Sequence, residues 1–374
     1  MRYDAVQPDT NGKGAFHRAT IRDVAAKAGV SITTVSHFVS GREGACSTTT
    51  AERIRSAIAE VRYVPNATAK ELGQKFSRTV GICLGNPVVE DFEDRGTYAH
   101  RVWKGVIKAA DRNDYLLLHY PQSVRFGQSI DAFVNGKADG VIIASHQGDP
   151  RPSIIWDFGV PVVAVVQNSD IPAGIGAVYA DESVTVDTAL THLWNIGHRR
   201  IAHITGPVEK FLMPNGWLTD PIDIAIWRRD AYVAWMKQRD AFLPQFVVDG
   251  HSWEGVDIPL AVRALYQLPD RPTAIFCAND VIALQTIEAA SDLGWRVPDE
   301  LSVVGVDNLD ASASSSPALS TVEVAGEEIG EQAMELLLSL ISGKPVPSLR
   351  VVVKGCRLME RDSTAPYGPG HTGQ

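Results

Sequence analysis

The stretch Thr20–Gly41, TIRDVAAKAGVSITTVSHFVSG, holds two polar residues in capping positions, each followed by apolar residues at helical spacing. Thr20 can cap a first helix with Asp23 at the favourable third position, and Gly29 ends that helix. Ser31 can cap a second helix after a tight turn. We expect an inner face of Val35, Phe38 and Val39 and an outer face of Ile32, Thr33, Ser36 and His37. Two short helices joined by a turn of three to four residues are typical of a helix-turn-helix unit.

A third amphipathic helix is predicted from about residue 50 to residue 61, with Ile54, Ile58 and Val61 inward and Arg53 and Arg55 toward solvent. A helix-turn-helix domain places the exposed face of its second helix in the major groove of DNA. There, hydroxyl side chains approach phosphates and longer side chains contact base edges. A small alanine-rich bundle without a ligand is the alternative that the spacing leaves open.

The charge distribution separates this segment from the rest of the chain. The net charge is −9, but residues 1–78 hold 12 Lys and Arg against 7 Asp and Glu, while the remainder holds 23 against 37. A basic head followed by an acidic body favours a small domain that is attracted to phosphate. A basic segment that is merely solvated has the same composition.

The segment Tyr63–Arg78, YVPNATAKELGQKFSR, follows the third helix. Pro65 ends that helix, Asn66 can cap a new one, and Ala67–Leu72 allows fewer than two turns. So short a helix is marginal in water, because nucleation costs more than a few hydrogen bonds return, and it needs a partner. The run from residue 20 to residue 72 resembles the DNA-binding headpiece and hinge of the lactose-repressor/galactose-repressor (LacI/GalR) family of bacterial transcription regulators.

The resemblance implies which residues meet DNA. The family's "DVA..AGVS" and "TVS" patterns are matched at residues 23–31 and 34–36. The helix positions that face bases in the family are here Ile32, Thr33 and His37. The residues near phosphates are Ser31, Thr34 and Ser36, and we include Thr20 among the DNA contacts.

The hinge pattern "PN..A..L" is matched at Pro65, Asn66, Ala69 and Leu72. The resemblance implies that Asn66 contacts a phosphate and that Leu72 from each of two subunits wedges into the minor groove and kinks the operator. Ala69 is counted with them as a DNA-binding residue. A core role for Leu72 and a simple capping role for Asn66 are the alternatives.

Three positions depart from the family pattern. His37 replaces the usual arginine, and an imidazole cannot make the bidentate contact with guanine that arginine makes. Ser40 replaces an asparagine, and Ala51 replaces an arginine that would contact phosphate. We therefore expect a different operator and a shifted affinity or half-site preference.

Residues 79–361 are predicted to alternate between strands and helices, which indicates a parallel α/β fold. The expected strands are TVGICLG, DYLLLHY, DGVIIAS, VPVVAVV, RIAHITG, QFVVDG, AIFCAND and LSVVGVDN. Helical stripes at residues 186–193 and 329–340 end at Gly197 and Gly343. Sheets of this kind bind ligands beyond the carboxyl ends of their strands.

The body resembles that of the same family, with two lobes like those of periplasmic sugar-binding proteins and an effector between them. The motifs that carry the likeness include GHRRIAHITGP, RPTAIFCANDVIA, VPDELSVVGVDN, PALSTV and LMERDS. The resemblance implies a first lobe of roughly residues 79–166 and 311–343. The second lobe then holds roughly residues 179–306 and a closing strand near 350–358.

The expected layout has five parts. They are a disordered extension at residues 1–17, a helix-turn-helix domain at 18–64, a hinge helix and linker at 65–78, a two-lobed effector-binding and dimerisation domain at 79–361, and a flexible tail at 362–374. The extension has the polar, Gly- and Pro-containing composition of disordered segments. A homodimer is preferred, because no leucine heptads of the kind that make tetramers occur near the C-terminus.

Four residues of the body are the candidates for effector binding. The arginine of the family's "R..GY" is matched by Arg228, which can hold a hydroxyl or carboxylate of the ligand, with Arg229 as its rival. Asn279, or its neighbour Asp280, and Asp307 follow strands and can bond sugar hydroxyls. Trp253 stands where the family often has an aromatic platform. Roles in packing or in loops are the alternatives for Trp253, Asn279 and Asp307.

Other classes of protein find little support. The GxSxG, HExxH, P-loop and GxGxxG motifs of enzymes are absent, and we expect no catalytic residue, metal or cofactor. The four cysteines form no CxxC pair. No apolar run approaches the roughly 18 residues needed to cross a bilayer, and an exported solute-binding protein would need a signal peptide. We expect a cytoplasmic, nucleoid-associated protein with no membrane partner.

The predicted protein is a dimeric regulator, with repressor favoured, whose two headpieces bind a near-palindromic double-stranded operator and whose hinge helices fold on DNA. Binding of an effector changes how the lobes are set. A sugar is the favoured effector; a nucleobase, another effector and no small-molecule effector are the alternatives.

Overall fold

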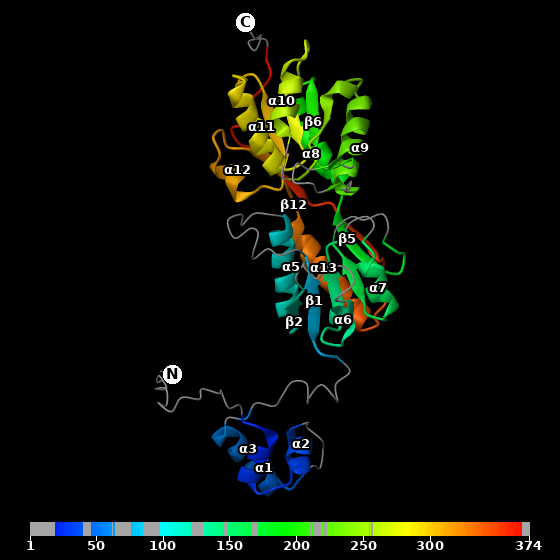
Figure 1. Cartoon of the computed structure of the whole chain (residues 1–374), viewed down its shortest axis with the longest axis vertical. Helices are drawn as coiled ribbons and strands as arrows, with labels where there is room; N and C mark the ends of the chain where they lie inside the picture. Colours follow the sequence, from blue (N-terminus) through cyan, green and yellow to red (C-terminus); the bar gives the residue numbers. More distant parts are fainter. Residues whose placement is uncertain are drawn as a thin grey trace. The chain divides into compact units, whose positions relative to one another are not determined.

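The computed structural model describes residues 19–39, 46–61, 63, 76–84, 98–120, 130–145, 149–165, 171–209, 211–212, 218–219, 223–253, 255 and 257–368 (Figure 1). The chain divides into two compact units, residues 1–77 and residues 78–374, which we call the headpiece and the body. The extension at residues 1–17 and most of the hinge, including Asn66, Ala69 and Leu72, lie outside the described residues. Across the described ranges, no helix combines the length and apolar character that a membrane span requires.

The headpiece contains the three expected helices: α1 (Ile21–Ala28), α2 (Ile32–Val39) and α3 (Thr48–Glu60). The Asp23 carboxylate accepts hydrogen bonds of 2.7 Å from both the backbone N–H and the hydroxyl of Thr20, which fixes the start of α1. Gly29 ends α1 with φ 64°. α3 starts two residues before the expected position, because the Ser47 hydroxyl accepts the Thr50 N–H at 3.3 Å.

A small apolar core holds these three helices together. Val24, Val35 and Ile54, one from each helix, are fully buried. Phe38, Val39 and Ile58 pack against this core and remain partly exposed. The amphipathic faces predicted for α2 and α3 are thus confirmed.

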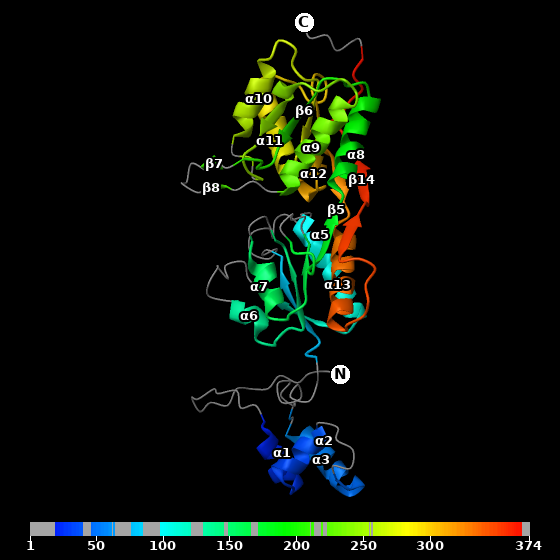
Figure 2. The same ribbon diagram turned by 90° about the vertical axis from the view of Figure 1, so that its right-hand side faces the viewer.

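The described residues of the body form two six-stranded sheets, the first of which lies in lobe one. Its strand order is β13-β5-β4-β3-β1-β2, and every pairing is parallel. Helices α5 and α13 cover one face and α6 and α7 the other (Figure 2). The elements are β1 (Thr79–Cys83), α5 (Tyr98–Arg112), β2 (Leu116–His119), α6 (Ile130–Val134), β3 (Gly140–Ile143), α7 (Arg151–Asp157), β4 (Val162–Ala164), β5 (Gly176–Ala180), α13 (Gly326–Ile341) and β13 (Arg350–Val353).

The second sheet, in lobe two, has the order β14-β12-β11-β10-β6-β9, with only β14 antiparallel. Helices α8 and α9 pack on one face, and α10 and α11 on the other. The elements are α8 (Glu182–Asn195), β6 (Ile201–Thr205), the short pair β7 (Phe211–Leu212) and β8 (Leu218–Thr219), α9 (Asp223–Lys237), η1 (Pro244–Phe246), β9 (Val247–Asp249), α10 (Ile258–Tyr266), β10 (Ala274–Cys277), α11 (Asp280–Asp292), β11 (Ser302–Val306), α12 (Asp310–Ser314), β12 (Ser320–Val324) and β14 (Cys356–Met359).

The chain passes between the lobes three times within the described residues: after β5, after β12 and after β13. The expected assignment of all of residues 311–343 to lobe one is wrong, because β12 pairs with β11 in lobe two. The closing strand expected near 350–358 is also wrong as one element. Its first half, β13, pairs with β5, and its second half, β14, pairs with β12. Both errors come from hydrogen bonds between distant strands, which local patterns do not report.

The C-terminal segment differs from the flexible tail that was expected after residue 361. Ser363 is fully buried; its hydroxyl donates to the Val303 carbonyl at 2.6 Å and accepts the Ser320 N–H at 2.8 Å. The Tyr367 N–H donates to the Ile196 carbonyl at 2.7 Å. Composition suggested a loose segment, but these bonds to lobe two order the residues up to Tyr367.

Helices α5 and α13 approach each other closely in lobe one. A Cβ added at Gly105 would lie 1.9 Å from the Glu327 carbonyl oxygen, and one at Gly330 would lie 2.0 Å from the Val102 carbonyl oxygen. Lys104 reaches the Glu327 carboxylate at 2.8 Å across the same contact. The two helices therefore touch backbone to backbone, which only glycine permits at these positions.

Candidate nucleic-acid interface and ligand site

The outer face of α2 is the candidate nucleic-acid interface. Ile32, with 46% of its surface exposed, lies there with Thr33 and Ser36, which are also exposed, while His37 and Thr34 are partly exposed. An aliphatic side chain at this position can contact base edges and thymine methyl groups.

Ser31 begins this helix in the way the sequence predicted. Its hydroxyl accepts the Thr34 N–H at 3.1 Å and lies 2.8 Å from the Thr34 hydroxyl. Both hydroxyls keep hydrogen-bonding capacity beyond this contact. They stand at the N-terminus of α2, whose partial positive charge favours a phosphate.

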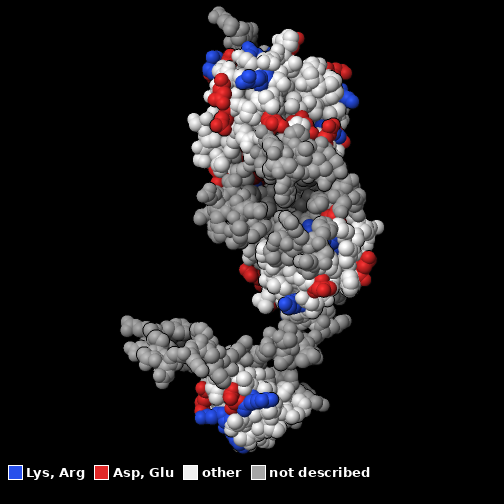
Figure 3. All heavy atoms as spheres, in the orientation of Figure 1, with Lys and Arg blue, Asp and Glu red and all other residues white. Residues whose placement is uncertain are grey.

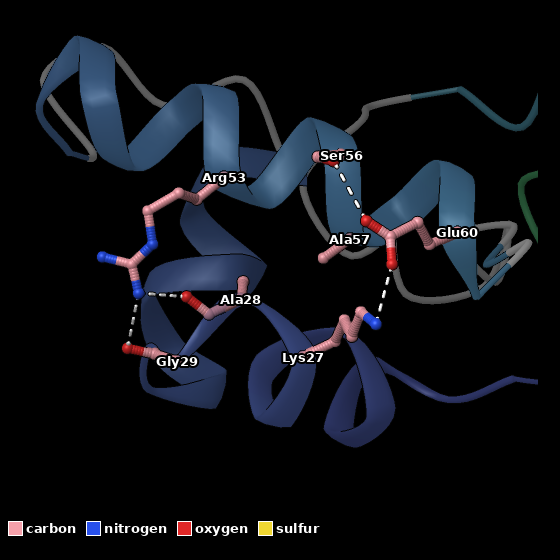
Figure 4. Close-up of a pocket in the computed structure, with 7 residues that line it drawn as sticks. All are labelled: Lys27, Ala28, Gly29, Arg53, Ser56, Ala57 and Glu60. Atoms are coloured by element: carbon pink, nitrogen blue, oxygen red, sulfur yellow. Dashed lines mark hydrogen bonds and ion pairs between the residues drawn. The ribbon is translucent and has the colours of Figure 1, made fainter.

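A hollow of about 250 Å³ lies between α1 and α3 in the headpiece (Figure 4). The Lys27 ammonium and the Glu60 carboxylate meet at 2.7 Å on one side of it. On the other side the Arg53 guanidinium donates to the carbonyls of Ala28 and Gly29. Arg53 is exposed, as expected, but its hydrogen bonds hold the end of α1.

Positive and negative side chains alternate on the headpiece surface seen in Figure 3. The Arg55 guanidinium lies 5.5 Å from the centre of the Phe38 ring, so it covers part of α2. Ala51 is partly buried in α3 and brings no charge to this surface. Ion pairs such as Lys27–Glu60 therefore offset part of the positive charge of the headpiece.

In the body, Arg228 on α9 is buried at 5% exposure and forms an ion pair with Glu182, the first residue of α8. Arg228 Nε donates to one carboxylate oxygen at 2.5 Å, and Nη2 donates to the other at 3.3 Å. Nη1 donates to the Ala278 carbonyl at 2.5 Å. Asp181 caps α8 by accepting the Ser183 N–H at 3.1 Å, which keeps Glu182 at the helix start.

Asp307 lies just after β11, at the carboxyl end of its strand. Its φ is 111°, which is rare for a residue other than glycine. The pKa of Asp307 is raised to about 7, chiefly by burial; the charge of Arg228 lowers it, the charges of Asp280 and Glu182 raise it, and the charge of Arg101 lowers it. Among the described residues, no side chain or backbone N–H donates to its carboxylate. Asp307 is thus an acceptor, held in a strained conformation, that a ligand donor can satisfy.

Asp280 differs from Asp307 because its carboxylate is fully bonded. It is fully buried and accepts the Leu309 N–H at 2.9 Å, the Ser312 hydroxyl at 2.6 Å and the Thr321 hydroxyl at 2.5 Å. Burial raises its pKa to about 6 in spite of these bonds. Asp280 therefore anchors the segment that follows Asp307.

The structure gives Asn279 and Trp253 contacts with the protein. The Asn279 amide oxygen accepts the Ile282 N–H at 2.8 Å and caps α11, while its amide nitrogen donates to the Trp253 carbonyl at 3.0 Å. The Trp253 ring lies over Gly206, where an added Cβ would be 2.7 Å from the ring. The loop role considered for both residues accounts for these contacts; ligand binding by them stays a prediction.

Two residues of lobe one that the sequence did not single out lie close to Asp307. The Tyr98 hydroxyl donates to the Val165 carbonyl at 3.2 Å, and the charges of Glu182, Arg228 and Asp307 act on it. The Arg101 guanidinium donates to the Asn308 carbonyl at 2.6 Å. Both residues lie at the start of α5, in the connection after β1, where the rule for parallel sheets places ligands.

A pH dependence follows from Asp307. Its pKa of about 7 in the folded protein exceeds the ordinary value of 3.8, so the group favours folding below pH 4 and loses that contribution as pH rises through 7. Asp307→Asn should therefore lose less stability than the wild type between pH 5 and pH 8, by on the order of 2 kcal/mol. Thermal unfolding at the two pH values measures the difference. The exposed Asp292→Asn is the control, and equal slopes in all three proteins would contradict the assignment.

Three family models match the chain. The model described as "Bacterial regulatory proteins, lacI family" matches residues 20–66. "Periplasmic binding proteins and sugar binding domain of LacI family" matches residues 92–218, and "Periplasmic binding protein-like domain" matches residues 190–364. The headpiece thus matches one family model, and the body matches two others.

Curated relatives are similar over most of their length. The HTH-type transcriptional repressor CytR of Escherichia coli (strain K12) is 29% identical over 353 residues, which cover 92% of this chain and 96% of that protein. The ribose operon repressor of Haemophilus influenzae is 28% identical over 346 residues, covering 90% and 95%. The HTH-type transcriptional repressor PurR of Klebsiella pneumoniae (strain 342) is 28% identical over 355 residues, covering 93% and 97%.

Solved structures share the same arrangement. The complex of the transcriptional regulator CelR with cellobiose has 25% identity and a TM-score of 0.63, covering 92% of this chain and 100% of that one. The Lac repressor dimer bound to operator and the anti-inducer ONPF has 23% identity and a TM-score of 0.74, covering 93% and 100%. At 23% identity, the similarity to the Lac repressor dimer supports the fold alone.

Proposed function

Because the chain belongs to the LacI family of bacterial regulatory proteins, we propose that it represses transcription by binding operator DNA under the control of a small-molecule effector. The observation that carries the proposal is the exposed face of α2, where Ile32 and Thr33 stand beside hydroxyl groups on a well-capped helix.

The DNA contacts divide into two groups. Ile32, Thr33 and His37 face base edges, and their identities set the preferred operator. Ser31, Thr34, Ser36 and Thr20 lie at helix starts or on the same face and contact phosphates, which position the headpiece.

The hinge residues Asn66, Ala69 and Leu72 complete the interface. Asn66 contacts a phosphate, and Leu72 of each subunit enters the minor groove, where an apolar wedge unstacks one base step. Two subunits acting together need a near-palindromic operator, so the working form is a homodimer. A protein of this kind acts in the cytoplasm, at the nucleoid.

The effector is held in the body by Arg228 and Asp307, with Asn279 and Trp253 as further contacts. A sugar is favoured, since the regulator CelR, to which this chain is similar, was solved with cellobiose and another relative is named a ribose operon repressor. A nucleobase, or a body without a small-molecule effector, is the alternative.

The test begins with selection of bound sequences from a random DNA library by the full-length protein. We expect enrichment of one near-palindromic site, and its affinity should fall steeply with salt. Adding sugars, nucleobases and phosphorylated sugars to the selected complex should identify a compound that changes operator affinity. Binding without any sequence preference would overturn the proposal.

A single substitution tests the role of His37. His37→Arg should shift the selected operator toward guanine at one position of each half-site, because a guanidinium makes two hydrogen bonds to guanine. We expect a gain of about 1–3 kcal/mol for that base over the wild type. Competition binding with the two operators measures it, and Glu52→Arg, an exposed change on α3, controls for added charge. An unchanged preference would place His37 away from the bases.

A further inference from the structure

Arg228 has no uncompensated charge to offer a ligand. All three of its guanidinium nitrogens donate to protein oxygens, two of them to the Glu182 carboxylate. Arg228 and Glu182 are 5% and 4% exposed, so water screens the pair little. An anion that approached Arg228 would meet Glu182 first, or would have to leave that carboxylate buried and unpaired.

Two arginines of lobe one, Arg101 on α5 and Arg151 at the start of α7, also form ion pairs. The Arg101 guanidinium reaches the Glu323 carboxylate at 3.4 Å. The Arg151 guanidinium donates three hydrogen bonds of 2.7 to 3.1 Å to the Asp149 carboxylate, and the Arg151 backbone N–H donates a fourth at 3.0 Å. Neither arginine therefore supplies a free positive charge for an anionic ligand.

Asp307 lies near the Glu182–Arg228 pair, and its carboxylate is still able to accept hydrogen bonds. Its carboxylate accepts no hydrogen bond among the described residues, and the charges of Asp280 and Glu182 act on it. A ligand hydroxyl or amine would supply a donor. A phosphate or carboxylate would add a further negative charge and donate little.

We propose that Glu182 determines the specificity of the ligand site: by neutralising Arg228 it excludes anionic effectors and admits uncharged, polyhydroxylated ones whose hydroxyl groups donate to Asp307. The inference rests on the proposed function of this site as the effector site. It names the chemical class of the effector, which the family does not determine.

Inorganic phosphate is the probe that tests the neutralisation of Arg228. Thermal unfolding of the full-length chain is followed with rising phosphate, at constant ionic strength, for the wild type, Asp307→Asn and the double variant Glu182→Gln/Asp307→Asn. In the first two proteins Glu182 still neutralises Arg228. In the double variant Arg228 is the only charged member of the three, so phosphate should stabilise it.

We expect phosphate at ten times its dissociation constant to raise the Tm of the double variant by about 3 °C more than that of the wild type. Phosphate also stabilises proteins in general, and the exposed Glu288→Gln measures that effect. Adding Arg228→Gln to the double variant should remove the gain. If the double variant does not fold alone, Glu182→Asn/Asp307→Asn replaces it, and refolding yields in phosphate and in chloride give the same comparison.

Equal phosphate responses in the double variant and the wild type would overturn the inference. So would tighter binding of ribose 5-phosphate than of ribose to the wild type. Neither measurement involves DNA. Failure of the proposed function is recognised separately, as the absence of a selected operator or of any effect of ligands on operator affinity.

Discussion

Replacing Arg228 with methionine is expected to lower the free energy of unfolding of the body by about 3–5 kcal/mol. The substitution removes the partner of the Glu182 carboxylate, which is 4% exposed and, among the residues that the structure describes, is bonded to no other cation. It also removes the donor to the Ala278 carbonyl. Urea unfolding followed by tryptophan fluorescence measures the loss.

Two variants separate this cause from others. Arg229→Met changes the neighbouring arginine, which pairs with Asp230 at 2.8 Å on the surface, and should cost less than about 1 kcal/mol. Arg228→Met combined with Glu182→Leu replaces the whole pair with apolar side chains and should recover most of the loss. A single Arg228 variant as stable as the wild type would show that the pair is not buried in solution.

The second large effect is expected from Gly330→Ala. In an ordinary helix this change stabilises by roughly 0.5–1 kcal/mol. Here the new Cβ would lie 2.0 Å from the Val102 carbonyl oxygen and 2.8 Å from the Val106 nitrogen, both in the backbone of α5. Because backbone atoms cannot move aside individually, the helices must separate, and we expect a loss of about 3 kcal/mol.

Thermal unfolding of Gly330→Ala is compared with Gly368→Ala, where an added Cβ meets nothing within 4 Å. The control should unfold at the wild-type temperature. Separation of α5 from α13 should also displace Arg101, and with it the bond to Asn308 at the lobe junction. A Gly330→Ala protein more stable than the wild type would mean that the two helices are further apart than described.

Features that depend on neighbouring residues could be predicted from the sequence. Thr20, Gly29 and Ser31 mark the helix ends of the headpiece because caps and left-handed turns are local properties. All eight apolar runs that were predicted as strands form strands in the structure. Each run could be recognised from its own residues, because it is several residues long and ends at turn-forming residues. The parallel order of the sheets followed from their alternation with helices.

Features that depend on distant residues could not be predicted. Glu182 and Arg228 are 46 residues apart, and nothing beside either one indicates the pair. The same holds for β13 and β14, whose partners precede them by long stretches of chain. Asn279 was interpreted as a ligand contact because it follows a strand, but that position is also the cap of α11, and the cap uses its amide oxygen.

The three passages between the lobes also limit how this protein can be cut or fused. Lobe one is assembled from the residues up to and including β5, from α13 and from β13, so a continuous fragment that contains all of lobe one also contains most of lobe two. A chain shortened at residue 349 would lose an edge strand from both sheets at once, although the missing piece is only the last 25 residues. Fragments for complementation, or new termini for circular permutation, should therefore be chosen in surface connections that leave β13 and β14 attached.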